Sequence, residues 1–282
     1  MIALGENRYG KSRVRVVRVR RSKEVHELRE WTVQILLQGD FESCFSEGDN
    51  SKILPTDTMK NTVYSLARRS SARSIEEFAK DLVDFLLGRN PQVSHAQVRI
   101  AEKVWEHAAI NGNPHPTTFI QAASEHPTTA VERAQGGMFS VVSGFENLII
   151  MKTADSGFED YIQDDLTTLK PVSDRLFGTV VRASWTYARP DLDFDKLRSK
   201  IRESLIAAFA DHQSRSVQHT LYAMGEAALA AVPEIQDVEL TMPNIHCLLV
   251  DLKPFGQDNP NEIFVPTDEP HGYIEARLSR QG

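Results

Sequence analysis

Apolar residues cluster along the first 40 positions in the spacing of β-strands. Both clusters are rich in Val, Ile and Leu, which favour strands. In the first cluster, Val14 and Val16 share one face, whereas Val17 and Val19 share the other. This change of register predicts a β-bulge or a strand covered on both sides. The two predicted strands are residues 12–21 and 25–38.

Two stretches of helical periodicity follow. A helix is predicted from Thr56-Asp57 to about Arg69, because Thr and Asp are good N-cap residues. A second helix is predicted from Ser74, which forms a capping box with Glu77. Its apolar stripe consists of Phe78, Leu82, Phe85 and Leu86.

The rest of the chain repeats this order of elements. The first half ends in predicted strands at about Val93–His107 and Thr117–Ala123. The second half has strands at 138–152 and 178–189, helices at Asp193–His212 and Ser216–Val232, and strands at 235–242 and 245–252. The helix stripes are Leu197, Ile201, Leu205 and Phe209, then Val217, Leu221, Met224 and Ala228.

The repeat predicts an α+β fold made of two ββααββ modules, residues 1–137 and 138–282. Sequential strands imply an antiparallel sheet with helices on one face. Such sheets have unpaired edges, and oligomerisation into a closed barrel would remove them.

Composition indicates an ordinary globular protein with no membrane span. The chain has 282 residues, 41% hydrophobic and 25% charged, and no apolar run of about 20 residues. Its first residues lack the apolar core of a secretory signal, and LSRQG at the other end is not a peroxisomal Ser-Lys-Leu signal, so we expect a cytoplasmic protein. Two distant cysteines, Cys44 and Cys247, provide neither a disulfide framework nor a metal-ligand spacing.

The net charge of −7 argues against nucleic-acid binding by the protein as a whole. One stretch differs, since Lys11–Lys23 carries seven basic residues and no acidic one. Charge runs of this kind usually form a solvated face. We therefore expect a strand with solvated arginines.

Polar residues at predicted element ends are the candidates for chemistry, and each also has a structural reading. Lys11 alone is a surface lysine, Arg175 a surface ion-pair partner and Gln218 a solvated residue of a first helical turn. Asn244 and His246 fit a turn followed by a core histidine. His107, His115 and His126 form no metal-ligand spacing.

Taken together, six stretches resemble the urate oxidase family, in the same order and at similar separations. The resemblance covers nearly the whole chain and is strongest around TDTMKNTVY and FGQDNPNEIF. The six stretches are GENRYGK (5–11), TDTMKNTVY (56–64), TTLKPVSDR (167–175), SVQHTLYAMGE (216–226), MPNIH (242–246) and FGQDNPNEIF (255–264).

The resemblance implies the tunnelling fold, a homotetramer with active sites between subunits, and oxidation of urate by dioxygen. The expected products are 5-hydroxyisourate and hydrogen peroxide, on the way to allantoin, and no cofactor or metal is implied. By motif, Lys11, Thr56 and His246 match the family's proton-relay residues. The matching substrate-binding residues are Thr56, Asp57, Phe158, Arg175, Val217, Gln218 and Asn244.

The residue types suit this chemistry. A guanidinium such as that of Arg175 can donate two hydrogen bonds to adjacent ring N and carbonyl O atoms. The amide of Gln218 matches a neighbouring lactam, and Phe158 can stack on a flat ring. Predicted helix starts at Thr56-Asp57 and Val217-Gln218 favour anions. Lys11 must be neutral to remove a proton, which Thr56 would relay and His246 would tune or receive.

Departures from the family pattern leave rival functions to consider. Ile245 stands where a basic residue is common, Cys247 where an aromatic residue or histidine is common, and 107–135 matches poorly. A zinc-dependent cyclohydrolase of the same fold would need paired Cys and His ligands and a glutamate at the position of Gln218. A non-catalytic purine-binding protein would have no need of Lys11 and Thr56.

Overall fold

The computed structural model describes residues 2–122, 124–267 and 269–281, and it divides into two units. The first unit runs to Phe145 and includes Thr186–Lys196. The second comprises Glu146–Trp185 and the chain from Leu197 onward. The module limits predicted at residues 1 and 282, and Ala123 at a predicted strand end, lie outside the described residues. The predicted boundary between residues 137 and 138 stays a prediction.

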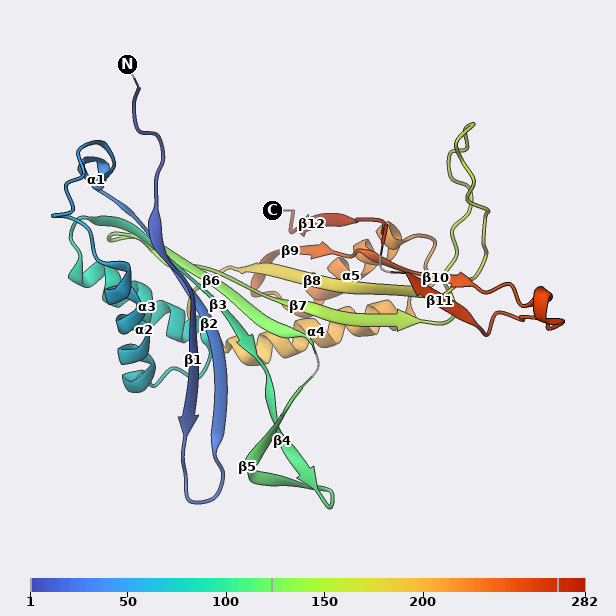
Figure 1. The fold of residues 1–282 in the computed structure, drawn as a ribbon, viewed down its shortest axis with the longest axis horizontal. Coiled ribbons are helices and arrows are strands. Elements are labelled where there is room, and N and C mark those ends of the chain that lie inside the picture. Colours follow the sequence, from blue (N-terminus) through green and yellow to red (C-terminus); the bar gives the residue numbers. More distant parts are fainter. Residues whose placement is uncertain (1, 123, 268, 282) are drawn as a thin grey trace. The chain divides into compact units, whose positions relative to one another are not determined.

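The first unit contains an antiparallel sheet with two helices on one face (Figure 1). Its strand order is β1-β2-β3-β6, and each strand runs antiparallel to its neighbour. The strands are β1 (Tyr9–Arg20), β2 (Glu27–Gly39), β3 (Val93–Lys103) and β6 (His126–Ala134), and the helices are α2 (Thr56–Arg69) and α3 (Ile75–Arg89). The predicted antiparallel α+β arrangement is confirmed.

The core of the first unit lies between this sheet and its helices. The side chains of Trp31, Val33, Ile35 and Leu37 alternate along β2 and are fully buried. Trp31 stacks on Phe78 of α3 with ring centroids 4.8 Å apart. The helical stripe predicted for α3 faces this core, except that Phe85 is only half-buried.

The capping of α3 was predicted nearly in full. Ser74 is the N-cap, and its hydroxyl accepts a hydrogen bond from the backbone N–H of Glu77 at 3.2 Å. The carboxylate of Glu77 accepts from the N–H of Arg73, one residue before the N-cap. In a capping box the Glu77 carboxylate would accept from the N–H of the N-cap, Ser74. Here it accepts from the residue before, so this one bond is displaced by one residue.

The register of β1 changes earlier than the valine pattern predicts. The irregularity lies between Lys11 and Val14, where Arg13 has a φ of 58°. From Val14 to Arg20 the pairing with β2 is continuous, so Val14 and Val16 are buried while Val17 is exposed. The strand does contain a bulge, but it lies at residues 12–13, so the register change predicted between the two valine pairs is wrong.

The basic stretch of β1 is not a fully solvated face. The guanidinium of Arg18 lies 4.5 Å from the Trp31 ring centroid, and that of Arg20 donates to the carbonyl oxygens of Ser70 and Ala72. Burial lowers the pKa of Arg18 to about 10. Arg18 and Arg20 both donate to backbone carbonyls of the α2–α3 connection and hold it against the sheet, which corrects the prediction.

A second hairpin interrupts the first unit where long strands were predicted. After β3 the chain forms β4 (Trp105–Ile110) and β5 (Asn113–Gln121), a separate two-stranded sheet that projects beyond β3 (Figure 1). Asn111 and Gly112 both have positive φ at its turn. The strand that pairs with β3 is therefore β6, and the strand predicted from Thr117 corresponds to part of β5 in the separate hairpin. The Asn111-Gly112 pair is a strong local signal for this hairpin.

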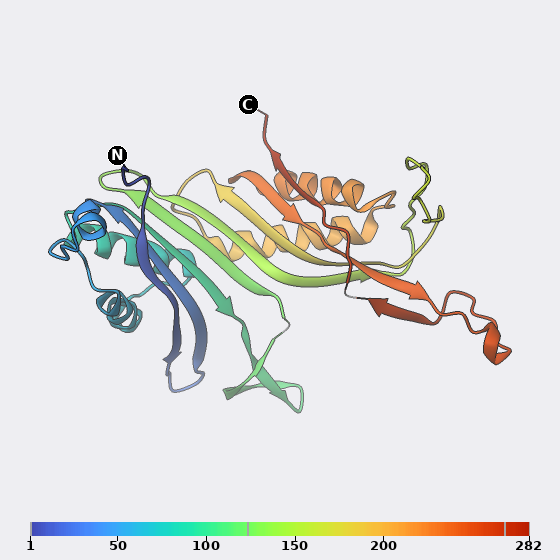
Figure 2. The same ribbon diagram turned by 45° about the horizontal axis from the view of Figure 1, so that its top comes forward.

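The second unit also places two helices on one side of its strands. Helices α4 (Phe194–Asp211) and α5 (Val217–Ala231) lie on the same side of β8 (Phe177–Tyr187) and β9 (Ile235–Thr241) in two views (Figure 1, Figure 2). The predicted α4 and α5 stripes are buried. Strand β7 (Ser140–Lys152) begins in the first unit and ends in this one.

The second unit does not end with its predicted last strands. β10 (Asn244–Leu249) pairs with β8 and with β11 (Phe264–Thr267), and β12 (Glu275–Ser279) pairs with β9. Two short helices, α1 (Glu42–Ser46) and η1 (Lys253–Phe255), were also not predicted. Short, partly exposed elements carry little periodicity, so the pattern missed them. No helix in the described part of the chain is long and apolar enough to cross a membrane.

Candidate functional site

The candidate residues of the first unit lie where β1 meets the start of α2. Lys11 is half-buried in β1, directly before the bulge. Its positive charge helps to lower the pKa of Asp57, after the larger contributions from Lys60, so the two side chains share one electrostatic environment. Because a bulge re-aims the side chains beside it, the irregularity at residues 12–13 sets the direction of Lys11. We call Lys11, Thr56 and Asp57 the N-terminal half-site.

The start of α2 differs from its predicted capping. The N-cap is Pro55, which has no side-chain cap, and Thr56 and Asp57 are the first two helical residues. The carboxylate of Asp57 accepts hydrogen bonds from Lys60 and Asn61 instead of capping the backbone. The first amides of a helix have no intrahelical acceptor, so those of Thr56 and Asp57 suit an anionic or carbonyl oxygen.

In the second unit, Phe158 and Arg175 lie against each other. The guanidinium carbon of Arg175 is 5.4 Å from the centroid of the Phe158 ring. The ring of Tyr161 also stacks on that of Phe158, with centroids 4.9 Å apart. Arg175 Nε is buried and has no hydrogen-bond partner among the described residues. Burial lowers the pKa of Arg175. A buried guanidinium N–H without an acceptor is costly, so this atom is suited to a ligand oxygen or nitrogen.

Backbone hydrogen bonds join the segments that carry these side chains. Phe158 donates its N–H to Val172 O at 2.7 Å, and Val172 returns the bond at 3.1 Å. On the other side, Gly157 N–H donates to Ser214 O at 2.9 Å. The strand-like segment around Phe158 therefore lies between the segment that leads to Arg175 and the connector that leads into α5.

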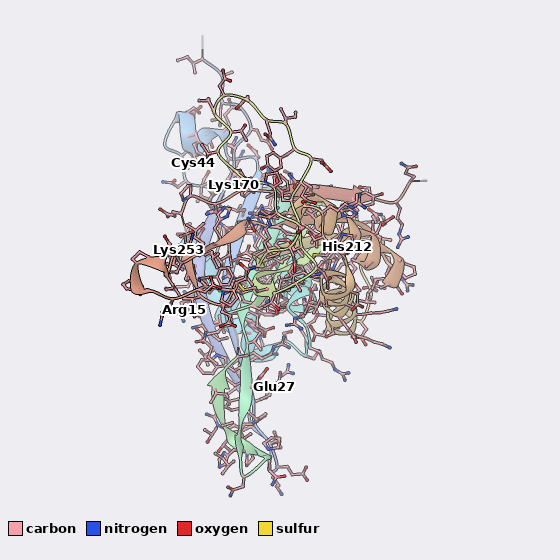
Figure 3. The ribbon with its side chains drawn as sticks, turned by 90° about the vertical axis from the view of Figure 1, so that its right-hand side faces the viewer. Arg15, Glu27, Cys44, Lys170, His212 and Lys253 are labelled. Carbon is pink, nitrogen blue, oxygen red and sulfur yellow. The ribbon has the colours of Figure 1, made fainter. Side chains whose placement is uncertain are left out.

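The start of α5 brings Val217 and Gln218 to this place. Ser216 is the N-cap, and its hydroxyl accepts from the N–H of His219 at 3.1 Å. Val217 is buried and Gln218 is exposed, so the apolar residue fixes the helix while the amide is available to a ligand. The histidines His212 and His219 span the connector with their ring nitrogens 3.1 Å apart. His212 lies at the end of α4 (Figure 3).

Asn244 and His246 are held beside the start of β8. Asn244 pairs with Thr179 and Ile245 with Gly178, only a few residues after Arg175. The side-chain amide nitrogen of Asn244 lies 3.4 Å from Nδ1 of His246. Asn244 is buried and His246 is half-buried. Asn244 is therefore not a solvated turn residue, and His246 is not a fully buried core histidine. The C-terminal half-site comprises Phe158, Arg175, Val217, Gln218, Asn244 and His246.

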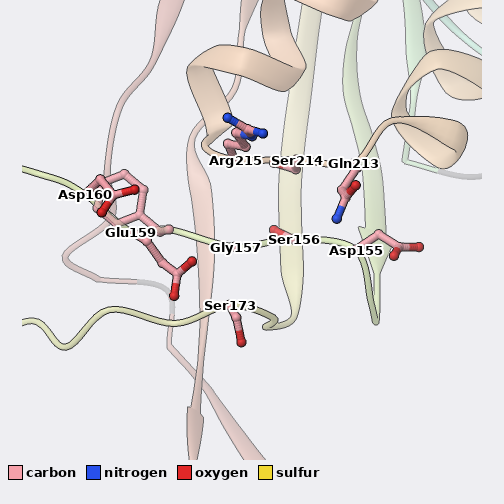
Figure 4. Close-up of a pocket in the computed structure, with 10 residues that line it drawn as sticks. Asp155, Ser156, Gly157, Glu159, Asp160, Ser173, Gln213, Ser214 and Arg215 are labelled. Carbon is pink, nitrogen blue, oxygen red and sulfur yellow. The ribbon is translucent and has the colours of Figure 1, made fainter.

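A cavity of about 350 Å³ opens beside Phe158 (Figure 4). The segment Asp155–Asp160 runs along it, with Ser173 on one side and the connector Gln213–Arg215 on the other. Its lining is mostly polar and includes backbone of the same segments that carry Phe158 and Val217. The cavity therefore adjoins the C-terminal half-site and has room for a small polar ring.

The structure brings the predicted residues together as two groups, one in each unit. Lys11, Thr56 and Asp57 belong to the first unit, and all the others belong to the second. Tyr9 and Ser216 support the two groups and were not predicted as functional. Ser216 was visible as a helix cap, whereas the partner of Tyr9 lies 45 residues away along the chain. No cluster of three metal-ligating side chains occurs among the residues that the structure describes.

Comparison with known proteins identifies the family. The model of the uricase family matches residues 7–132 and 141–275. The segment 107–132, which departs from the motifs, therefore falls inside the match. Uricase of Arthrobacter globiformis is 39% identical over 281 residues, covering 100% of this chain and 91% of the relative. Uricase of Dictyostelium discoideum is 36% identical and covers 99% and 98%.

Solved structures agree with the sequence relatives. The crystal structure of uricase from Arthrobacter globiformis superposes with a TM-score of 0.95 at 38% identity, covering 100% of this chain and 96% of that one. A urate oxidase from Bacillus sp. TB-90, only 21% identical, shares the fold with a TM-score of 0.84. The chain belongs to the uricase family.

Proposed function

We propose that this chain is an enzyme that oxidises urate with dioxygen. Urate, dioxygen and water give 5-hydroxyisourate and hydrogen peroxide. Urate loses two electrons and gains the hydroxyl of water, and dioxygen takes up both electrons and two protons. The full-length family match is the main support for this reaction.

The C-terminal half-site would bind the substrate. Phe158 offers an aromatic ring, and the guanidinium of Arg175, whose Nε is buried and unpartnered, lies beside that ring. A flat acidic heterocycle could stack on the ring while its edge accepts charge-assisted hydrogen bonds from the guanidinium. Gln218 would complement a lactam edge, and Asn244 would face dioxygen or water. The unpartnered Arg175 Nε beside Phe158 is the observation that supports this role most directly.

The N-terminal half-site would move protons. Neutral Lys11 would accept a proton from urate, and Thr56 would relay it, with His246 tuning or receiving it. The loss of a second proton makes urate a stronger reductant, so it can transfer an electron to dioxygen directly. No step requires a cofactor or metal, and that absence stays a prediction.

We further propose that two chains build each site and that four form the active particle. The half-sites belong to different units, so the N-terminal half-site of one chain would face the C-terminal half-site of the next. Strand β1 pairs only with β2 among the described residues, which leaves one strand edge for such a contact. Two head-to-tail dimers would close barrels and stack as a tetramer. A cytoplasmic location also stays a prediction, which cell fractionation tests.

One assay tests the reaction. Purified protein should consume urate and oxygen in equal amounts, produce peroxide, and keep its activity in excess chelator. Activity lost on chelation and restored by a metal ion would contradict cofactor-free chemistry. Binding of urate without consumption would indicate a non-catalytic purine-binding protein.

A further inference from the structure

The hydroxyl of Tyr9 connects the strand of Lys11 to the segment before Thr56. It accepts a hydrogen bond from the backbone N–H of Leu54 at 2.9 Å and donates one to the carbonyl oxygen of the same residue at 3.2 Å. Both bonds are partly buried and span 45 residues of sequence. One hydroxyl therefore forms hydrogen bonds with both the N–H and the C=O of Leu54, as the backbone of a neighbouring strand would. We call this contact the Tyr9–Leu54 clamp.

The aromatic ring of Tyr9 is itself held in place. It meets the ring of Phe41 edge-to-face, with centroids 4.8 Å apart and planes at 86°. Phe41 is fully buried. Because edge-to-face pairs fix ring orientation, the hydroxyl position is set by the core and not by solvent.

The link from Tyr9 to Lys11 is rigid. Gly10 lies so close to β2 that a Cβ atom there would come within 1.8 Å of Ile35 O. Tyr9, Gly10 and Lys11 all pair in register with β2. The bulge begins only after Lys11, so little freedom remains between the clamp and the amine.

The link from Leu54 to Thr56 is equally short and stiff. The only intervening residue is Pro55, whose ring fixes φ, here −56°. Thr56 then begins α2, where Met59 N–H donates to Pro55 O. A displacement at Leu54 is therefore passed directly to the Thr56 hydroxyl.

We infer that Tyr9 is a positioning residue, which sets the separation and orientation of Lys11 and Thr56 for proton transfer. This role rests on the proposed function. Tyr9 does not belong to the proton relay itself, since both hydrogen-bond partners of its hydroxyl are backbone groups of Leu54, which neither supply nor accept a proton. Proton relays depend steeply on geometry, so loosening the clamp should slow turnover and leave substrate binding to the C-terminal half-site unchanged.

The test compares Tyr9→Phe with Tyr64→Phe. Tyr64 is on α2 with its side chain exposed, so its loss of a hydroxyl is a matched control. Tyr9→Phe should lower kcat by about ten- to a hundredfold with nearly constant KM. In a Lys11→Met background the same substitution should have little further effect, because the two changes act on one relay. Unchanged kcat in Tyr9→Phe, or a fall in kcat matched by Tyr64→Phe, would overturn the inference.

Amide hydrogen exchange tests the clamp without relying on activity. In Tyr9→Phe, exchange at Leu54 and at Met59 should become faster, because the first amide loses its bond to Tyr9 and the second bonds to Pro55 O at the loosened helix start, while that of α5 should not change. Unchanged exchange at Leu54 would overturn the clamp. If the wild-type chain consumed no urate, the proposed function would fail, and the exchange result would still decide whether Tyr9 holds this segment.

Discussion

The two candidate half-sites use the same structural element in different ways. Each is built at the start of a helix, α2 in the first unit and α5 in the second. The α2 start follows Pro55, has no side-chain cap, and depends on a tyrosine hydroxyl from a distant strand. The α5 start is capped by Ser216 from within the connector. The first helix start is fixed by a side chain from a distant strand, whereas the second has a side-chain cap from its own connector.

The side chains around the two helix starts also differ in their chemistry. An amine and a hydroxyl, Lys11 and Thr56, lie at the start of α2, and both are groups that can take part in proton transfer. A guanidinium and an aromatic ring, Arg175 and Phe158, lie near the start of α5. These groups bind without exchanging protons. The comparison supports a division into a proton-relay half and a binding half, with Asp57 as the exception in the first and His246 as the exception in the second.

The largest expected effect comes from removing the relay. Lys11→Met and Thr56→Val should each lower kcat by a factor of about 10² to 10⁴, because they break proton transfer. Affinity for a purine that the enzyme cannot oxidise should change little. Steady-state kinetics and calorimetric titration provide the two measurements. Intact turnover in Lys11→Met would remove the distinction between the halves.

Arg175→Ala should act on binding instead of turnover. Losing a charge-assisted hydrogen bond worth about 1.5–3 kcal/mol should raise KM by about ten- to a hundredfold. Arg175→Lys should recover little of this affinity, since an ammonium group cannot form a planar pair of bonds. An effect on kcat alone would assign Arg175 to the chemical step and reverse the proposed roles.

Ser216→Ala should produce a smaller effect on the same half. Loss of an N-cap costs about 1 kcal/mol, and a frayed α5 start should raise KM by about two- to fivefold. Ser74→Ala removes the equivalent cap of α3 and is the matched control. Thermal unfolding should show similar losses of stability for both variants. If KM rose equally in both, the effect would be a general one and not specific to α5.

The smallest expected effect is the pH dependence of stability from His212. Burial, then the charges of His219 and Lys152, lower its pKa below the ordinary value of 6.5. As the pH falls, the unfolded chain therefore protonates His212 before the folded chain does. The free energy of unfolding is unaffected by this group above about pH 6.5 and decreases as the pH falls below that value. His212→Asn should flatten part of the decline in Tm between pH 7 and pH 5. An unchanged slope would show that His212 does not contribute.

Some of this organisation could be predicted from the sequence, and the rest depends on contacts between distant residues. The apolar stripes of α4 and α5 and the caps at Ser74 and Ser216 are local signals, so these helices were predicted well. The cap predicted at Thr56 was wrong because Pro55 precedes it in an extended conformation and takes the N-cap position. The β4–β5 hairpin has a local signal in its turn residues, Asn111 and Gly112, which the alternation of apolar and polar positions does not reveal.

The candidate site was predicted only through the family motifs. Neither periodicity nor composition distinguishes Arg175 or Lys11 from other basic surface residues. The buried Nε of Arg175 and the bulge after Lys11 distinguish them in three dimensions. The Tyr9–Leu54 clamp could not be predicted, since it depends on a contact across 45 residues.

The most direct test of a site shared between chains is complementation between two inactive variants. Thr56→Val keeps an intact binding half, and Arg175→Ala keeps an intact relay half. When the two chains are unfolded and refolded together, some mixed contacts should unite both intact halves. Part of the wild-type activity should then return in a particle of about four times 31.7 kDa. An active monomer, or no recovery from well-mixed oligomers, would show that each chain builds its site alone.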